Sequence, residues 1–148
     1  MVAPKELIQQ ARALRHLILR HPPGHAQRTL AYFMALGHYD SQIRRLRRHL
    51  VERRQVLQTA IDAEGLFSHS AAHFGGTSFW VSGPDWLDSR ILADRAMRDG
   101  VLIEAGDVFF DRDAPPLNYF RLSYSAISAD RISEGIAHLA ANMRKLKP

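Results

Sequence analysis

The feature that most constrains this fold is a change in hydrophobic periodicity at Gly65. Before this glycine, apolar residues recur at helical spacing, most clearly along the stripe from Ile43 to Ile61. After it, short β-branched and aromatic stretches alternate with Gly- and Pro-rich turns. The pattern predicts a helical segment over residues 1–64 and a small α/β domain over 65–148, together forming one unit. The expected fold class is α/β (α+β), with a mostly antiparallel sheet and helices packed on one face.

Three helices are predicted in the first half. One covers about residues 4–20, because Pro4 suits a first helical turn and the sequence HPPG interrupts the apolar pattern. A short second helix ends at Gly37, which favours a left-handed cap. The third is the longest, with Asp40 as its predicted N-cap and an end before Gly65.

The second half predicts the order strand, helix, strand, strand, helix. The strands fall at about 77–82, 101–106 and 119–125, and the first helix at 88–100. Ser128 is the predicted N-cap of the last helix. A strand-helix-strand unit can leave its two strands parallel, with another strand inserted between them as an antiparallel neighbour.

Composition excludes several kinds of site. There are no cysteines, so disulfides and thiolate zinc sites are excluded. No apolar run is long enough for a membrane span, and a cytoplasmic location is expected. The eight histidines include His69 and His73, four residues apart, but no nearby carboxylate completes a recognisable zinc triad. No Gly-x-Ser-x-Gly elbow marks a serine hydrolase.

The basic residues form a second candidate feature. The net charge is +5, and all but three of the 20 basic residues are arginines. The predicted third helix carries a dense group of them: Arg44, Arg45, Arg47, Arg48, Arg53 and Arg54. Such a stripe could neutralise nucleic-acid phosphates, or it could be a solvated outer face with local pairing to Glu52. Aromatic residues for base stacking are not interleaved with it.

A single arginine interrupts the last predicted strand, whose sequence is NYFRLSYS. Strand alternation puts Phe120, Leu122 and Tyr124 on one face and Arg121 on the other. The apolar face would pack against helices. Arg121 then needs an anion opposite it if it is buried, and otherwise forms an exposed cross-strand salt bridge.

Several segments together resemble a known family. They are GGTSFWV, GVLIEAGDVFF, NYFRLSYS and SADRISEGIAHLA. This series resembles the C-terminal small domain of fold-type-I, pyridoxal-phosphate-dependent aminotransferases (class I/II). The upstream sequence HAQRTLAYFMALGHYDSQIRRLRRHLVERRQVL resembles the MocR branch of GntR-type transcription regulators, in which an aminotransferase-like domain follows a winged-helix DNA-binding domain.

The resemblance implies a site around Arg121. In the family, this arginine binds the α-carboxylate of the amino-acid substrate or effector. Gly106, Phe109 and Phe110 correspond to the loop that lines the same cleft, and Ala105 stands where many relatives have proline. We expect Phe109 and Phe110 to be exposed where the large domain or a dimer partner would cover them.

The family's cofactor-binding lysine has no counterpart in this sequence. The resemblance therefore implies a fragment of a larger protein that binds pyridoxal phosphate, with no covalent attachment to this chain and no catalysis by it alone. Its expected partners are an amino-acid-like effector, the missing large domain and a second copy in a homodimer, with DNA contacted only by an absent winged-helix domain. The alternatives are the small domain of a genuine aminotransferase and a nucleic-acid-binding module that uses the arginine-rich helix.

Overall fold

The computed structural model describes residues 2–68 and 76–148, which divide into two compact units. The first unit ends at Arg45 and the second begins at Leu46, so this division lies inside the long helix. The predicted His69, His73 and Gly75 features lie outside the described residues. Each unit is therefore described separately, and all site residues discussed below belong to the second.

The first unit contains helices α1 (Lys5–Ile18) and α2 (Gly24–Ala35) and the beginning of α3. Neither α1 nor α2 has a buried residue. The apolar stripes predicted from the sequence are present but exposed, and their large members include Leu7, Leu14, Ile18, Leu30, Phe33 and Met34. In the described part of the first unit, these stripes lack the partner surface that normally stabilises an amphipathic helix.

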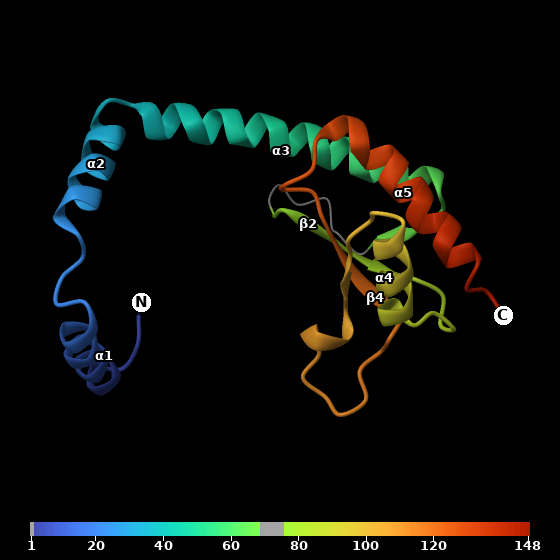
Figure 1. The fold of residues 1–148 in the computed structure, drawn as a ribbon, viewed down its shortest axis with the longest axis horizontal. Coiled ribbons are helices and arrows are strands. Elements are labelled where there is room, and N and C mark those ends of the chain that lie inside the picture. The colour runs from blue at the N-terminus through green and yellow to red at the C-terminus, as the bar shows by residue number, and fades with distance from the viewer. Residues whose placement is uncertain (1, 69–75) are drawn as a thin grey trace. The chain divides into compact units, whose positions relative to one another are not determined.

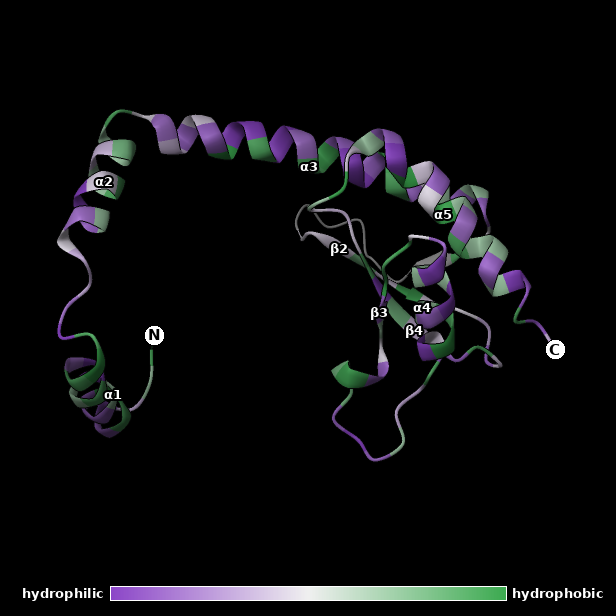
Figure 2. Cartoon of the chain, in the orientation of Figure 1, coloured by the Kyte–Doolittle hydropathy of each residue, from purple (hydrophilic) through white to green (hydrophobic). Residues whose placement is uncertain are grey.

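Helix α3 (His38–Ala63) begins three residues earlier than a helix with Asp40 as its N-cap would. Asp40 is therefore not its N-cap but lies in the first helical turn, where a carboxylate still favours the positive end of the helix dipole. Figure 2 shows hydrophobic positions recurring along a largely hydrophilic α3. Only the C-terminal half of this stripe is covered, and Leu57 and Ile61 are buried in the core of the second unit.

The second unit is built on a four-stranded antiparallel sheet with the order β1-β2-β4-β3. The strands are β1 (Phe67–Ser68), β2 (Ser78–Ser82), β3 (Glu104–Ala105) and β4 (Tyr119–Ser123). Because β4 pairs antiparallel with both β2 and β3, those two strands run parallel to each other with β4 inserted between them. This is the arrangement expected from the strand-helix-strand pattern.

One face of the sheet packs against helices α4 (Ser89–Arg98) and α5 (Ala129–Arg144), which Figure 1 shows beside β2 and β4. The buried core combines residues of the sheet with residues of these helices and of α3. Its members are Leu57, Ala60, Ile61, Phe79, Val81, Leu87, Leu92, Ala96, Phe120, Leu122, Tyr124, Ile132, Ile136, Leu139 and Met143. The predicted assignment of Phe120, Leu122 and Tyr124 to the helix-covered face is confirmed. The predicted fold class is likewise confirmed.

Two local predictions differ from the structure. The third strand is shorter than predicted, because Gly100 (φ +78°) ends α4 and Val101 donates its amide hydrogen to the carbonyl of Ala96. Ser128 occupies the N-cap position of α5, but its hydroxyl makes no capping bond. Its hydrogen bond to Asp130 instead lowers the pKa of that carboxyl.

Two classes of feature are not found within residues 2–68 and 76–148. No helix there has the length and apolar character to cross a bilayer. No group of three or more metal-ligating side chains is present in the same ranges.

Candidate functional site

The candidate site lies on the sheet face opposite the helices. Strand pairing places Trp80 of β2 opposite Arg121 of β4, and Arg121 opposite Glu104 of β3. Alternation puts Tyr119 on this same face, two residues before Arg121. Trp80, Tyr119 and Arg121 are half-buried, in contrast to the buried residues that alternate with them. A row of polar and aromatic side chains therefore crosses three neighbouring strands.

Arg121 forms an ion pair with Glu104. Its Nη2 lies 2.7 Å from Oε1 and 2.5 Å from Oε2 of the carboxylate, so one nitrogen contacts both oxygens. The hydrogen bond to Glu104 raises the pKa of Arg121 above its ordinary value, and the guanidinium stays charged. This is the exposed cross-strand salt bridge that strand alternation allowed, because the two side chains are 40% and 51% exposed.

One hydrogen-bond donor of the Arg121 guanidinium is unpaired. Arg121 Nε is buried, and within the described part of the chain it has no hydrogen-bond acceptor. The ring of Phe109 lies over the group, with 5.2 Å between Arg121 Cζ and the ring centroid. This is the geometry of a cation–π contact. This donor is therefore unpaired but covered, and an anion can pair with it only after neighbouring side chains move.

Four aromatic rings form a cluster beside Arg121. Trp80 stacks on Tyr119 with 5.7 Å between centroids, and it meets Phe109 edge-on at 5.6 Å. Phe110 contacts both Trp80 and Tyr119, at 5.9 Å and 5.6 Å. Phe109 is the most exposed of the group, at 51%. The structure thus brings the two phenylalanines predicted for the cleft loop next to the predicted carboxylate-binding arginine.

Gly106 positions this loop. It precedes the short 3-10 helix η1 (Asp107–Phe109), and its amide donates a 2.8 Å hydrogen bond to the carbonyl of Tyr119. A methyl group at Gly106 would lie 2.5 Å from that same oxygen and 2.8 Å from Cη2 of Trp80. Only glycine allows so close an approach, which explains in physical terms why the predicted loop residue is a glycine.

The arginine-rich helix is partly committed to internal contacts. Arg53 donates a 2.6 Å hydrogen bond to the carbonyl of Ser125, and Arg54 lies over the ring of Phe79, with 5.4 Å between its Cζ and the centroid. Arg45 donates to Gln42 within the helix. These contacts favour a structural role for the C-terminal arginines of the stripe.

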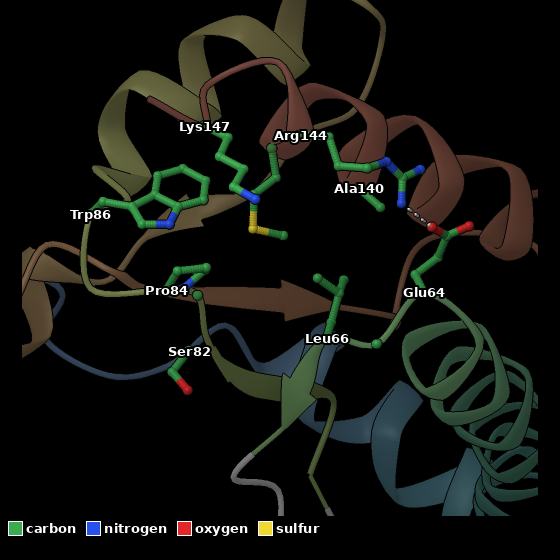
Figure 3. A pocket seen from close by; sticks show the side chains of 11 residues that line it. Glu64, Leu66, Ser82, Pro84, Trp86, Ala140, Arg144 and Lys147 are labelled. Atoms are coloured by element: carbon green, nitrogen blue, oxygen red, sulfur yellow. Dashed lines mark hydrogen bonds and ion pairs between the residues drawn. The ribbon is translucent and has the colours of Figure 1, made fainter.

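A separate pocket with a volume of about 410 Å³ lies where the ends of α3, β2 and α5 meet. Figure 3 shows Leu66, Pro84 and Trp86 around it, with the Glu64–Arg144 ion pair (3.0 Å) at one side. None of the residues predicted for the site lines this pocket. It is distinct from the Arg121 face.

Solved structures define the class of fold. An α-aminoadipate aminotransferase from Thermus thermophilus, solved with N-(5'-phosphopyridoxyl)-L-leucine, matches 98% of this chain with a TM-score of 0.81 and 26% identity, over 37% of its own chain. A kynurenine aminotransferase from Pyrococcus horikoshii matches 78% of this chain at 30% identity, with a TM-score of 0.65, over 29% of its own length. The second unit and its helices therefore have an aminotransferase-like fold.

Sequence relatives point more specifically to regulators. The HTH-type transcriptional regulator TauR of Rhodobacter capsulatus is 46% identical over 97% of this chain, and the HTH-type regulator YdfD of Bacillus subtilis is 26% identical over 82%. The chain spans 30% and 25% of these two proteins. No family model matches the chain. The predicted resemblance to aminotransferase-like domains of such regulators is confirmed.

Sequence reasoning missed three participants in the site. The sequence pattern indicates Glu104 only as part of a predicted strand, and Trp80 and Tyr119 only as strand-forming residues. Strand alternation carries a signal for Trp80 and Tyr119. They lie on the same sheet face as Arg121, opposite the face of the buried residues that alternate with them. The register that pairs Glu104 with Arg121 could not be deduced from the sequence.

Proposed function

We propose that this chain is part of the effector-binding domain of a GntR/MocR-type transcription regulator and that Arg121 binds the carboxylate of an amino-acid effector. Similarity to HTH-type regulators supports the regulatory role, and the aminotransferase-like fold supports the ligand class. The observation that carries the site is the incompletely satisfied guanidinium of Arg121 on the helix-free sheet face. A carboxylate is the planar anion that an arginine fork binds best.

The surrounding residues would orient such a ligand. The Arg121 guanidinium fixes the carboxylate, while Phe109 and Trp80 supply apolar and aromatic surface beside it. Gly106 holds the loop that carries Phe109 against the sheet. The combination recognises an anionic group next to an apolar or planar one, as in an amino acid.

The described residues around Arg121 suit the carboxylate of an amino acid but not pyridoxal phosphate. Within the second unit, Lys145 and Lys147 follow the end of α5, whereas the recorded partners of Arg121 are Glu104 and Phe109. We infer that pyridoxal phosphate is held by a large domain of the longer protein. That domain, and a second copy in a homodimer, would also cover the exposed apolar stripes of α1 and α2. DNA would be contacted by a winged-helix domain.

A genuine aminotransferase is the alternative function. It is supported by the solved structures, which are enzymes with the same fold. Arg121 would then bind a substrate carboxylate. The sequence encoded upstream of Met1 distinguishes the two: a winged-helix domain supports the regulator, and an aminotransferase large domain without one supports the enzyme.

The carboxylate role can be tested by nuclear magnetic resonance on the 148-residue chain. Because Arg121 Nε is buried, its N–H hydrogen is protected from rapid exchange and reports directly on the guanidinium. Titration with glycine should shift this resonance saturably, with a dissociation constant in the millimolar range. Arg131→Gln is a matched control on the exposed surface of α5, and it should leave the titration unchanged. A resonance that does not respond to glycine contradicts the proposal.

A further inference from the structure

Glu104 is paired with the Arg121 guanidinium, which is the group that a ligand carboxylate would need. The two residues face each other directly in the register of β3 and β4, and both side chains lie on the helix-free face. The backbone pairing fixes their proximity, because directly opposed strand residues have their Cβ atoms within about 5.5 Å of each other. A ligand that binds Arg121 therefore meets Glu104 as its immediate neighbour.

The geometry of the Arg121–Glu104 ion pair makes Glu104 a weak competitor of a ligand carboxylate for Arg121. Both carboxylate oxygens of Glu104 contact the same nitrogen, Nη2, so the two parallel bonds of a fork-to-fork pair are not made. Both side chains are also substantially exposed, which reduces the strength of their attraction. A ligand carboxylate that engages two nitrogens of Arg121 can displace Glu104.

When a ligand carboxylate displaces Glu104 from Arg121, the negative charge of Glu104 stays near the site. Glu104 sits on a strand whose backbone amides and carbonyls pair with β4, so its side chain can rotate away from Arg121 but stays close to it. The guanidinium of Arg112 lies over the ring of Phe110, with 5.1 Å between Cζ and the ring centroid. The freed carboxylate of Glu104 thus adds a negative potential where the rest of the ligand would lie.

We propose that Glu104 is a specificity residue that acts as a charge filter: it holds Arg121 in the absence of ligand and then disfavours ligands with a second carboxylate. The inference rests on the proposed carboxylate role of Arg121. It narrows the ligand class to amino acids with neutral or cationic side chains. A second carboxylate about 6 Å from Glu104 in this half-exposed site should weaken binding by about three- to tenfold.

L-Asparagine and L-aspartate test the filter, because they are nearly identical in shape and differ by one negative charge. Both are titrated into the 148-residue chain while the Arg121 Nε–H resonance is followed. In the native chain, asparagine should bind about three- to tenfold more tightly than aspartate. In Glu104→Gln the two affinities should become equal within about twofold, and asparagine itself should bind up to about fivefold more tightly, because its competitor is gone.

One control variant and two patterns of outcome separate the possible failures. Glu134→Gln makes the same charge change on the exposed surface of α5 and should retain the native preference for asparagine. If both ligands shift the resonance but Glu104→Gln keeps the native affinity ratio, the charge filter is wrong and the carboxylate role of Arg121 stands. If neither ligand shifts the resonance in the native chain or in Glu104→Gln, the proposed function fails and the filter fails with it.

Discussion

Replacing Gly106 with alanine should disrupt the candidate site, because the added methyl group has no room between β4 and Trp80. The added carbon would lie 2.5 Å from the carbonyl oxygen of Tyr119, 2.7 Å from its carbonyl carbon and 2.8 Å from Cη2 of Trp80. Two of these atoms belong to the backbone of β4 and cannot rotate away. The loop that carries Phe109 and Phe110 must therefore move off the sheet.

The cost has two main parts. Overpacking against fixed atoms costs about 1–3 kcal/mol. Movement of the loop also breaks the 2.8 Å hydrogen bond from the Gly106 amide to Tyr119, which is worth about 0.5–1.5 kcal/mol. Alanine restricts the unfolded chain and returns about 0.4–1 kcal/mol. The expected loss in free energy of unfolding is about 0.5–4 kcal/mol, with a central value of about 2 kcal/mol.

Urea unfolding measured in a Trp86→Phe background provides the assay, because Trp80 is then the only tryptophan. Gly106→Ala should lower the unfolding midpoint and change the near-ultraviolet circular dichroism of Trp80. Gly135→Ala is the matched control: it lies within α5 with open space around it, and should raise stability by up to about 1 kcal/mol. A Gly106→Ala chain as stable as the native one, with an unchanged Trp80 spectrum, would refute the assigned loop geometry.

Three other changes have definite expected outcomes. Phe120→Ala empties a fully buried position and should cost about 3–5 kcal/mol by urea unfolding, whereas a loss under 1 kcal/mol would contradict the core assignment. Asp88 caps α4 by accepting from the Arg90 amide at 2.9 Å, and Asp88→Ala should cost about 1 kcal/mol at neutral pH. The side-chain hydrogen bond to Arg90 lowers the pKa of Asp88 in the folded chain, so its contribution is complete above the unfolded-state pKa and is lost as pH falls through the folded-state pKa. The difference between the native and Asp88→Ala chains should therefore shrink in acid, and a constant difference would count against this pairing. Pyridoxal phosphate added to the chain should give no stoichiometric aldimine band, and one that borohydride abolishes would overturn the inference that the cofactor is held elsewhere.

Much of the fold follows from local patterns in the sequence. Alternation along β4 correctly separates Phe120, Leu122 and Tyr124 from Arg121, because a half-buried strand has a period of two. Helical periodicity and the left-handed glycines Gly37, Gly65 and Gly100 locate the main helix ends. These signals are local and need no knowledge of the tertiary structure.

The parts that were missed depend on tertiary structure. The partner of Arg121 is Glu104, seventeen residues earlier, and only the register of β3 with β4 brings them together. The short β3 and the early start of α3 follow instead from the glycine turns at Gly100 and Gly37. The apolar stripes of α1 and α2 identify helices, but their partner surface is not determined by the stripes themselves.

The most direct test of the proposed function is calorimetric titration of amino acids into the full-length protein loaded with pyridoxal phosphate. Arg121→Lys keeps the positive charge but removes the planar fork, so it should weaken amino-acid binding by at least about tenfold while leaving cofactor binding mostly intact. Equal amino-acid affinity in the native and Arg121→Lys proteins would contradict the assignment of Arg121 as the carboxylate-binding residue.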